Sequence, residues 1–184
     1  MVSLDGPEDL NDAIRGAGVF RRVMRNLSRI QPGFSSTVQV QCVVTRRNEH
    51  RLGELVEALR ATPVGWMTFS FYVPRANDDS GDAWETNEAR VGAVREVQRL
   101  KALHGGFIRN STRSLELMLP GSCEAITANC QTRERLLPLW LEGDHFTTPF
   151  CCYGNDVDCR RCGAWPVFQG AAQTARRVRH LLLD

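Results

Sequence analysis

The stretch TVQVQCVVT, residues 37–45, decides the fold class of this chain. Its first half alternates polar and apolar residues and its second half is continuously apolar, as in a strand that is buried on both faces. A helix-period segment follows, marked by Leu52, Leu55, Val56 and Leu59. A doubly buried strand followed by an amphipathic helix is one βα unit, and sheets built from such units are parallel.

Similar units lie on both sides of this stretch. Before it, the short apolar run 2–4 and the turn Asp5-Gly6-Pro7-Glu8 lead into a helical face formed by Phe20, Val23, Met24, Leu27 and Ile30. After it, a strand over 64–73 (VGWMTFSFYV) precedes a helix marked by Val91, Val94, Val97, Leu100 and Leu103. The sequence therefore predicts an α/β fold with three parallel βα units.

Three units neither close a barrel nor cover a parallel sheet on both faces. Because the run 2–4 begins in mid-strand, we expect the missing neighbours upstream of it. Beyond Phe107 the rhythm stops, and residues 109–184 hold turns, a helical stretch around 133–141 and most of the cysteines. We expect two parts: residues 1–108 as the last three units of a partial (β/α) barrel, and residues 109–184 as a small irregular cysteine-rich module.

Composition excludes several function classes. The 23 basic and 21 acidic residues give a net charge of +2, which is no electrostatic footprint for nucleic acid. No apolar run approaches the roughly 20 residues that cross a bilayer, and the N-terminal residues lack the features of a secretory signal. We therefore expect a cytoplasmic protein with no membrane or nucleic-acid partner.

Six of the seven cysteines are clustered. Cys42 stands alone, whereas the others fall within 40 positions, at Cys123, Cys130, Cys151, Cys152, Cys159 and Cys162. In a reducing compartment such residues persist as thiols rather than disulfides. Metal ligation is therefore the leading interpretation of the cluster.

The motif Cys159-Arg160-Arg161-Cys162-Gly163 carries the strongest chemistry. Two residues between the thiolates form a tight knuckle, in which Gly163 is expected to help the bend, and both sulfurs reach one metal ion or cluster. We expect Arg160 and Arg161 to lower the thiol pKa values. The remaining ligands are expected from Cys123, Cys130 and either Cys151 or Cys152.

Two alternatives to an iron-sulfur cluster stay open. One is that the cysteines are buried or free thiols without a ligand; a redox role fits less well, because a redox C-x-x-C normally opens a helix directly after a strand, whereas this motif follows the polar run 154–158. Zinc also accepts all-sulfur ligation, in which case the chain is a non-catalytic module that zinc holds together.

The opening SLDGPEDLNDAIRGAGVF, residues 3–20, resembles the fourth strand and following loop of radical S-adenosylmethionine (radical SAM) enzymes. VVTRRN at 43–48 and FSFYVP at 69–74 are similar to the fifth and sixth strands, and the cysteine-rich tail resembles the auxiliary-cluster extensions of that superfamily. The resemblance implies a partial (β/α)6 barrel in which a 4Fe-4S cluster cleaves S-adenosyl-L-methionine to start radical chemistry.

The C-x-x-x-C-x-x-C motif that holds the family's first cluster does not occur in this sequence. The chain therefore resembles the C-terminal half of such an enzyme, unable to react alone, with an auxiliary 4Fe-4S cluster and an unknown substrate. Its missing half is expected upstream or on a separate chain, as in a split radical enzyme.

The resemblance also implies cofactor-binding positions. Ser3 and Asp5 match positions that bond the ribose or amino-acid part of S-adenosylmethionine, Arg15 matches the arginine near its carboxylate, and Asn48 matches a polar position after strand five. Hydroxyl, carboxylate and guanidinium groups suit those contacts. A purely structural interpretation is also open: Asp5 organises its turn, Arg15 pairs with Asp12, and Asn48 caps the next helix.

Overall fold

A computed structural model describes residues 1–31, 33–34 and 38–181, except for the side chains of 132–133 and 175–181. Three parallel strands form the main sheet in the order β1 (Val2–Ser3), β2 (Gln39–Val44) and β3 (Trp66–Phe71). The predicted α/β class and the parallel pairing are confirmed. The predicted strand 37–45 corresponds to β2, with position 37 outside the described residues.

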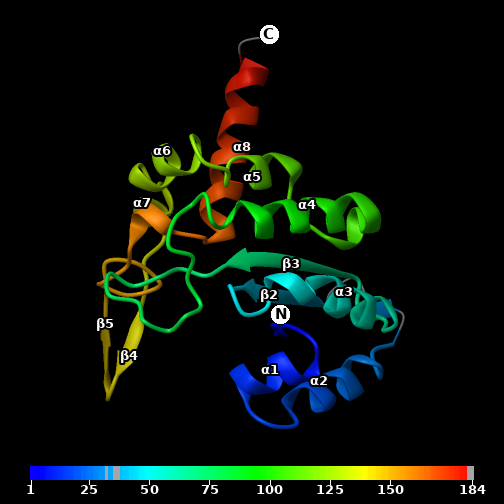
Figure 1. Cartoon of the computed structure of the whole chain (residues 1–184). Coiled ribbons are helices and arrows are strands. Elements are labelled where there is room, and N and C mark those ends of the chain that lie inside the picture. The colour runs from blue at the N-terminus through cyan, green and yellow to red at the C-terminus, as the bar shows by residue number, and fades with distance from the viewer. Residues whose placement is uncertain (32, 35–37, 182–184) are drawn as a thin grey trace.

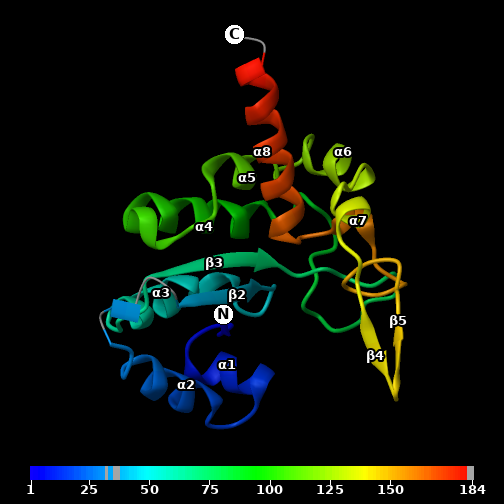
Figure 2. The same cartoon turned by 180° about the vertical axis from the view of Figure 1, so that it is seen from behind.

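Helices follow each strand, as the sequence predicts. β1 is followed by α1 (Glu8–Arg15) and α2 (Val19–Leu27), β2 by the 3-10 turn η2 (Glu49–Arg51) and α3 (Leu52–Arg60), and β3 by α4 (Val91–His104). Figures 1 and 2 show α1 and α2 on one side of the sheet and α4 on the other. The predicted apolar face of α4 is wrong at one position, because Leu103 is 65% exposed.

One hydrophobic core spans the chain from Leu4 to Ala172. In β2 the buried residues alternate, at Val40, Cys42 and Val44, whereas β3 is buried from its second residue to its last. Removing this apolar surface from water is the main stabilising term.

The C-terminal part consists of short elements and one long helix. They are η3 (Gly105–Phe107), α5 (Thr112–Glu116), α6 (Cys123–Ala128), α7 (Thr132–Arg135), β4 (Trp140–Glu142), β5 (His145–Thr147), η4 (Cys159–Arg161) and α8 (Trp165–Leu181). The helix predicted around 133–141 is wrong over most of its length: α7 ends at Arg135, residues 136–139 are not helical, and the exposed residues 140–142 form β4 and pair with β5. No helix within the described ranges combines the length and apolar character needed to cross a bilayer.

Loop residues cover the outer edge of β3. The backbone N–H of Arg109 donates to the Met67 carbonyl at 2.9 Å, and the Asn110 side chain exchanges two 2.8 Å hydrogen bonds with the Phe69 backbone. The Phe71 N–H then donates to the Gly163 carbonyl at 2.9 Å. These contacts attach the cysteine-rich segment to the carboxyl end of β3, and Figure 1 shows the loop after β3 passing beside that segment.

Gly163 allows this attachment by having no side chain. A Cβ atom there would lie 2.6 Å from both the Phe71 Cβ and the Tyr72 carbonyl oxygen. Its backbone is outside the left-handed region, so its role is close approach and not the bend expected from the sequence. The hydrogen bond between Gly163 and Phe71 therefore holds the adjacent Cys162 against the end of β3.

We predict that Gly163→Ala lowers the free energy of unfolding by about 1–3 kcal/mol, since the added methyl group overpacks a site bounded by backbone. The control is Gly170→Ala in α8, where a Cβ meets nothing within 4 Å. That change should stabilise the chain by about 0.4–1 kcal/mol. Urea unfolding of both variants measures the difference, and equal effects would contradict the close approach.

Candidate metal centre

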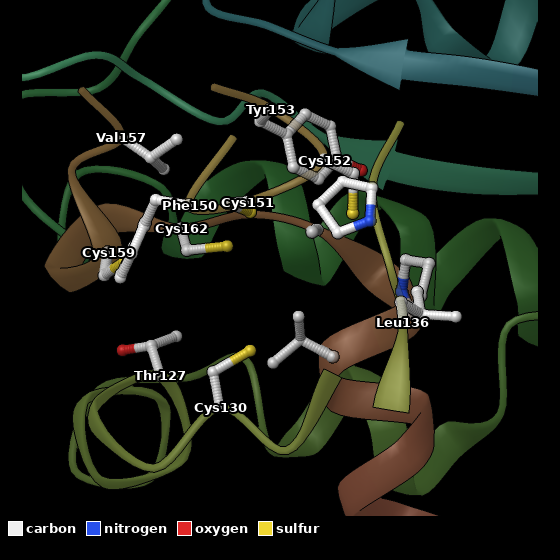
Figure 3. A pocket seen from close by; sticks show the side chains of 14 residues that line it. Thr127, Cys130, Leu136, Phe150, Cys151, Cys152, Tyr153, Val157, Cys159 and Cys162 are labelled. Atoms are coloured by element: carbon white, nitrogen blue, oxygen red, sulfur yellow. The ribbon is translucent and has the colours of Figure 1, made fainter. Parts of the chain in front are cut away.

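Five cysteines line one apolar cavity. The cavity has a volume of about 80 Å³, and Figure 3 shows its lining. The thiols belong to Cys130, Cys151, Cys152, Cys159 and Cys162. Leu136, Phe150, Tyr153, Val157 and Val167 supply much of the remaining wall.

Three separate segments bring these thiols together. Cys130 follows α6, Cys151 and Cys152 lie in the loop after β5, and η4 begins at Cys159 and ends just before Cys162. The sulfurs of Cys130 and Cys162 enter from opposite sides in Figure 3. The C-x-x-C motif and cysteines from two distant segments therefore line the same cavity.

Backbone hydrogen bonds hold each cysteine segment. Cys151 and Gly154 exchange bonds of 3.2 and 2.9 Å, and the Cys162 N–H donates to the Cys159 carbonyl at 3.3 Å. The segment that precedes the motif is tied to the loop after β3, because the Asp158 N–H donates to the Pro74 carbonyl at 2.9 Å. The thiol positions therefore depend on the sheet as well as on local turns.

Two of the cavity thiols, Cys162 and Cys152, favour the protonated form when no metal is present. Burial raises the pKa of Cys162 to about 12. A hydrogen bond with the Ala164 backbone lowers this pKa, whereas the negative charges of the neighbouring thiolates Cys130, Cys151 and Cys159 raise it further. Burial and the adjacent Cys151 also raise the pKa of Cys152. A bound cation would reverse this effect, because it supplies the positive charge that buried thiolates lack.

The expectation that Arg160 and Arg161 lower the thiol pKa values is wrong for Cys162. Arg160 is exposed, and the guanidinium of Arg161 is paired with Asp158 at 2.7 Å. A paired or solvated cation does little for a thiolate in an apolar cavity.

Arg90 is a buried cation that contacts the backbone of Cys162, and the sequence alone did not indicate it. It is 2% exposed, and its Nη1 donates to the carbonyls of Arg161 and Cys162 at 3.0 and 3.1 Å. Its Nε and Nη2 are buried with no hydrogen-bond partner among the described residues. One signal was present in the sequence: Arg90, Val94 and Val97 share the i, i+4, i+7 spacing of a buried helical face.

Two cysteines lie away from the cavity. Cys123 is 1% exposed at the start of α6, beside Glu124, and burial raises its pKa to about 11. Cys42 is wholly buried in β2, where burial raises its pKa well above the usual range. Of the six predicted metal ligands, the cavity thus brings together all except Cys123.

Within the described ranges, no three His, Cys, Asp or Glu side chains form a group that could hold a single metal ion. The five thiols are instead distributed around the cavity wall.

The polar positions at the carboxyl ends of β1 and β2 form a separate network. Asp5 pairs with Arg15 at 2.7 Å and accepts from the Val43 N–H at 2.9 Å. Arg15 therefore pairs with Asp5 and not with Asp12, which caps the start of α2 by accepting from two backbone N–H groups. Ser3 lies at the end of β1, next to this network.

Asn48 completes the network with three side-chain bonds. Its Oδ1 accepts from the Thr45 N–H at 2.8 Å, and its Nδ2 donates to the carbonyls of Asp5 and Val43 at 2.7 and 2.8 Å. It makes no side-chain cap bond to η2, so the capping interpretation is wrong. Asn48 instead ties the end of β1 to the end of β2.

The chain matches no protein-family model, no curated protein and no solved structure in the comparisons with known proteins.

We predict that raising the pH destabilises the metal-free chain partly through Cys162. A thiol whose folded pKa lies above its unfolded value stabilises the fold below pH 9.0, and this contribution is lost as pH rises toward about 12. Under reducing conditions, wild type should lose up to about 1.4 kcal/mol per pH unit more than Cys162→Ala in that range. Urea unfolding at several pH values measures the slopes, and parallel slopes would rule out this role.

We also predict that Asn48→Ala lowers the free energy of unfolding by about 3 kcal/mol or more, because it leaves buried backbone groups unsatisfied. Asn129→Ala is the control, since its exposed side chain makes one 3.0 Å bond to the Ala125 carbonyl and should cost less than about 1 kcal/mol. Thermal and urea unfolding without added cofactor measure both. A fully stable Asn48→Ala chain would show that the network is dispensable for folding.

Proposed function

We propose that this chain is the C-terminal half of a radical SAM-like enzyme and that its cysteine cavity binds an auxiliary 4Fe-4S cluster. The observation that carries the proposal is the convergence of five thiols from three segments on one apolar cavity. Cys159, Cys162 and Cys130 would supply three ligands, and Cys151 or Cys152 the fourth.

The donor set fits an iron-sulfur cluster. Every thiol at the cavity offers soft sulfur, the ligand type that selects iron-sulfur clusters and zinc. The sulfurs surround a space of about 80 Å³ and enter from opposite sides of it, which suits a body of several atoms better than a single ion. The cluster would supply one-electron chemistry or a substrate anchor when bound.

The surroundings also fit. The cavity wall is mostly apolar, with Leu136 and Phe150 about half exposed at its open side, and the buried guanidinium of Arg90 lies behind the buried Cys162. A nearby positive charge favours bound thiolates over free thiols. In this arrangement the chain's own residues would hold the ligands and balance part of their charge.

The position of the centre supports the barrel part of the proposal. The cysteine-rich segment is bonded to the loop after β3, at the carboxyl end of the parallel sheet, through the Ala76 N–H and the Asp156 carbonyl at 2.8 Å. Ligand sites of α/β barrels lie at this end of their strands. The three βα units would be the last three of a partial barrel, completed by an upstream or separate half.

The S-adenosylmethionine positions remain part of the proposal. In this chain Asp5, Arg15 and Asn48 shape the carboxyl ends of β1 and β2 through their own hydrogen bonds. They would position the loop that faces the cofactor, with Ser3 and the partly exposed Arg15 as the groups that could contact it. The substrate would be met by the completed barrel.

Anaerobic reconstitution with iron and sulfide tests the proposal. We expect about four iron atoms per chain and a broad absorption in the blue, as thiolate-bound clusters give. Cys159→Ser with Cys162→Ser should abolish both signals, because two ligands are lost. Cys42→Ala is the matched control and should keep them, since Cys42 lies in β2 away from the cavity.

Other outcomes decide between the alternatives. A colourless chain with one tightly bound zinc would favour a non-catalytic zinc module. The cluster proposal would be wrong if the wild-type chain bound neither iron nor zinc. It would also be wrong if the variant with both Cys159→Ser and Cys162→Ser bound as much iron as wild type. Cluster-dependent binding to a separate chain that carries C-x-x-x-C-x-x-C would favour the split enzyme.

A further inference from the structure

Arg90 is a buried cation at the junction between α4 and the C-x-x-C knuckle. It is the N-cap residue of α4, and its bonds to the Arg161 and Cys162 carbonyls join that helix to η4. Among the described residues it is one of the largest side chains that are almost completely buried. Its place is therefore set by two elements that are far apart in sequence.

Among the described residues Arg90 forms no ion pair with a carboxylate, and its Nε and Nη2 have no well-formed hydrogen bond, although a contact with the Cys123 thiol favours its charge. Burying a guanidinium without a counter-charge is strongly unfavourable, so an uncompensated buried cation calls for a specific explanation. The groups whose ionised forms favour its charge are Cys123, Cys162 and Glu124.

Glu124 keeps its negative charge while its two oxygens accept from the neutral Asn87 side chain at 2.8 Å and the Gly121 N–H at 3.0 Å, but it is exposed, so water screens its effect on Arg90. A small cavity of about 10 Å³ also borders Arg90, Asn87 and Trp84. Such a space holds at most about one water, which satisfies a hydrogen bond but supplies no charge. The two buried thiols Cys123 and Cys162 are the other groups whose negative forms favour the Arg90 charge, and of these only Cys162 lines the cysteine cavity.

We propose that Arg90 is the fixed counter-charge of the cysteine centre and sets the reduction potential of the cluster bound there. This inference rests on the proposed function. A cluster held by four thiolates is a net anion and becomes more negative when it accepts an electron. A buried positive charge behind Cys162 therefore stabilises the reduced form more than the oxidised form, and raises the potential.

Arg90 is thus a positioning and tuning residue, since it contacts the ligand segment through backbone carbonyls and does not line the cavity. Arg160 provides a matched comparison. It carries the same charge and lies between the two cysteines of the motif, but its side chain is exposed, where water and salt screen it.

The test is a redox titration of the reconstituted chain followed by electron paramagnetic resonance. Arg90→Gln should lower the reduction equilibrium constant of the cluster at least tenfold, which is about 59 mV more negative for a one-electron couple. Arg90→Lys, which keeps the charge, should stay closer to wild type than Arg90→Gln. Arg160→Gln should shift the constant by less than Arg90→Gln does.

Arg90→Met replaces Arg90→Gln if the buried amide prevents folding. Neutral variants that lose the cluster while Arg90→Lys keeps it would support the need for a charge. Loss of the cluster in Arg90→Gln, Arg90→Met and Arg90→Lys alike would contradict the inference about Arg90. An unchanged reduction potential in Arg90→Gln or Arg90→Met would contradict it as well, and neither result would question the cluster of the wild-type chain. A wild-type chain that takes up no iron would overturn the proposed function itself.

Discussion

The contact between the Gly163 backbone and the end of β3 is the constraint on which the rest of the centre depends. The bond from the Phe71 N–H to the Gly163 carbonyl is possible only because no Cβ stands between the two segments. It places the knuckle at the carboxyl end of the parallel sheet. The cavity, the turn at Cys151 and the bonds to Arg90 are all built around that fixed point.

The charges of the buried groups determine which ligand the cysteine centre favours. Buried thiols prefer their protons, and the buried guanidinium of Arg90 prefers an anion. Each of the two groups is unfavourable alone in an apolar interior, but a thiolate-bound cluster would satisfy both. The exposed or paired arginines within the motif have no comparable effect, because solvent or Asp158 already balances them.

The network at β1 and β2 shows how one set of polar residues can shape a site without being free to bind. The Asn48 side-chain amide hydrogen-bonds three backbone groups, and the Asp5 carboxylate binds both the Arg15 guanidinium and the Val43 N–H. These bonds fix where the strand ends and loops lie. Any cofactor role for this end of the sheet therefore acts through the loop geometry that the network sets and through the partly exposed Arg15.

The sequence by itself determined the α/β class, the order of the parallel units and the clustering of six cysteines in one part of the chain, because strand and helix periodicity and cysteine spacing are local properties. It did not determine that Cys123 lies off the cavity, that Asn48 ties two strands, that residues 140–142 are a strand, or that Arg90 is buried. Only the tertiary structure decided these, because burial and convergence depend on which distant segments pack together. A charged or thiol side chain has the same local signature whether it faces water or a core.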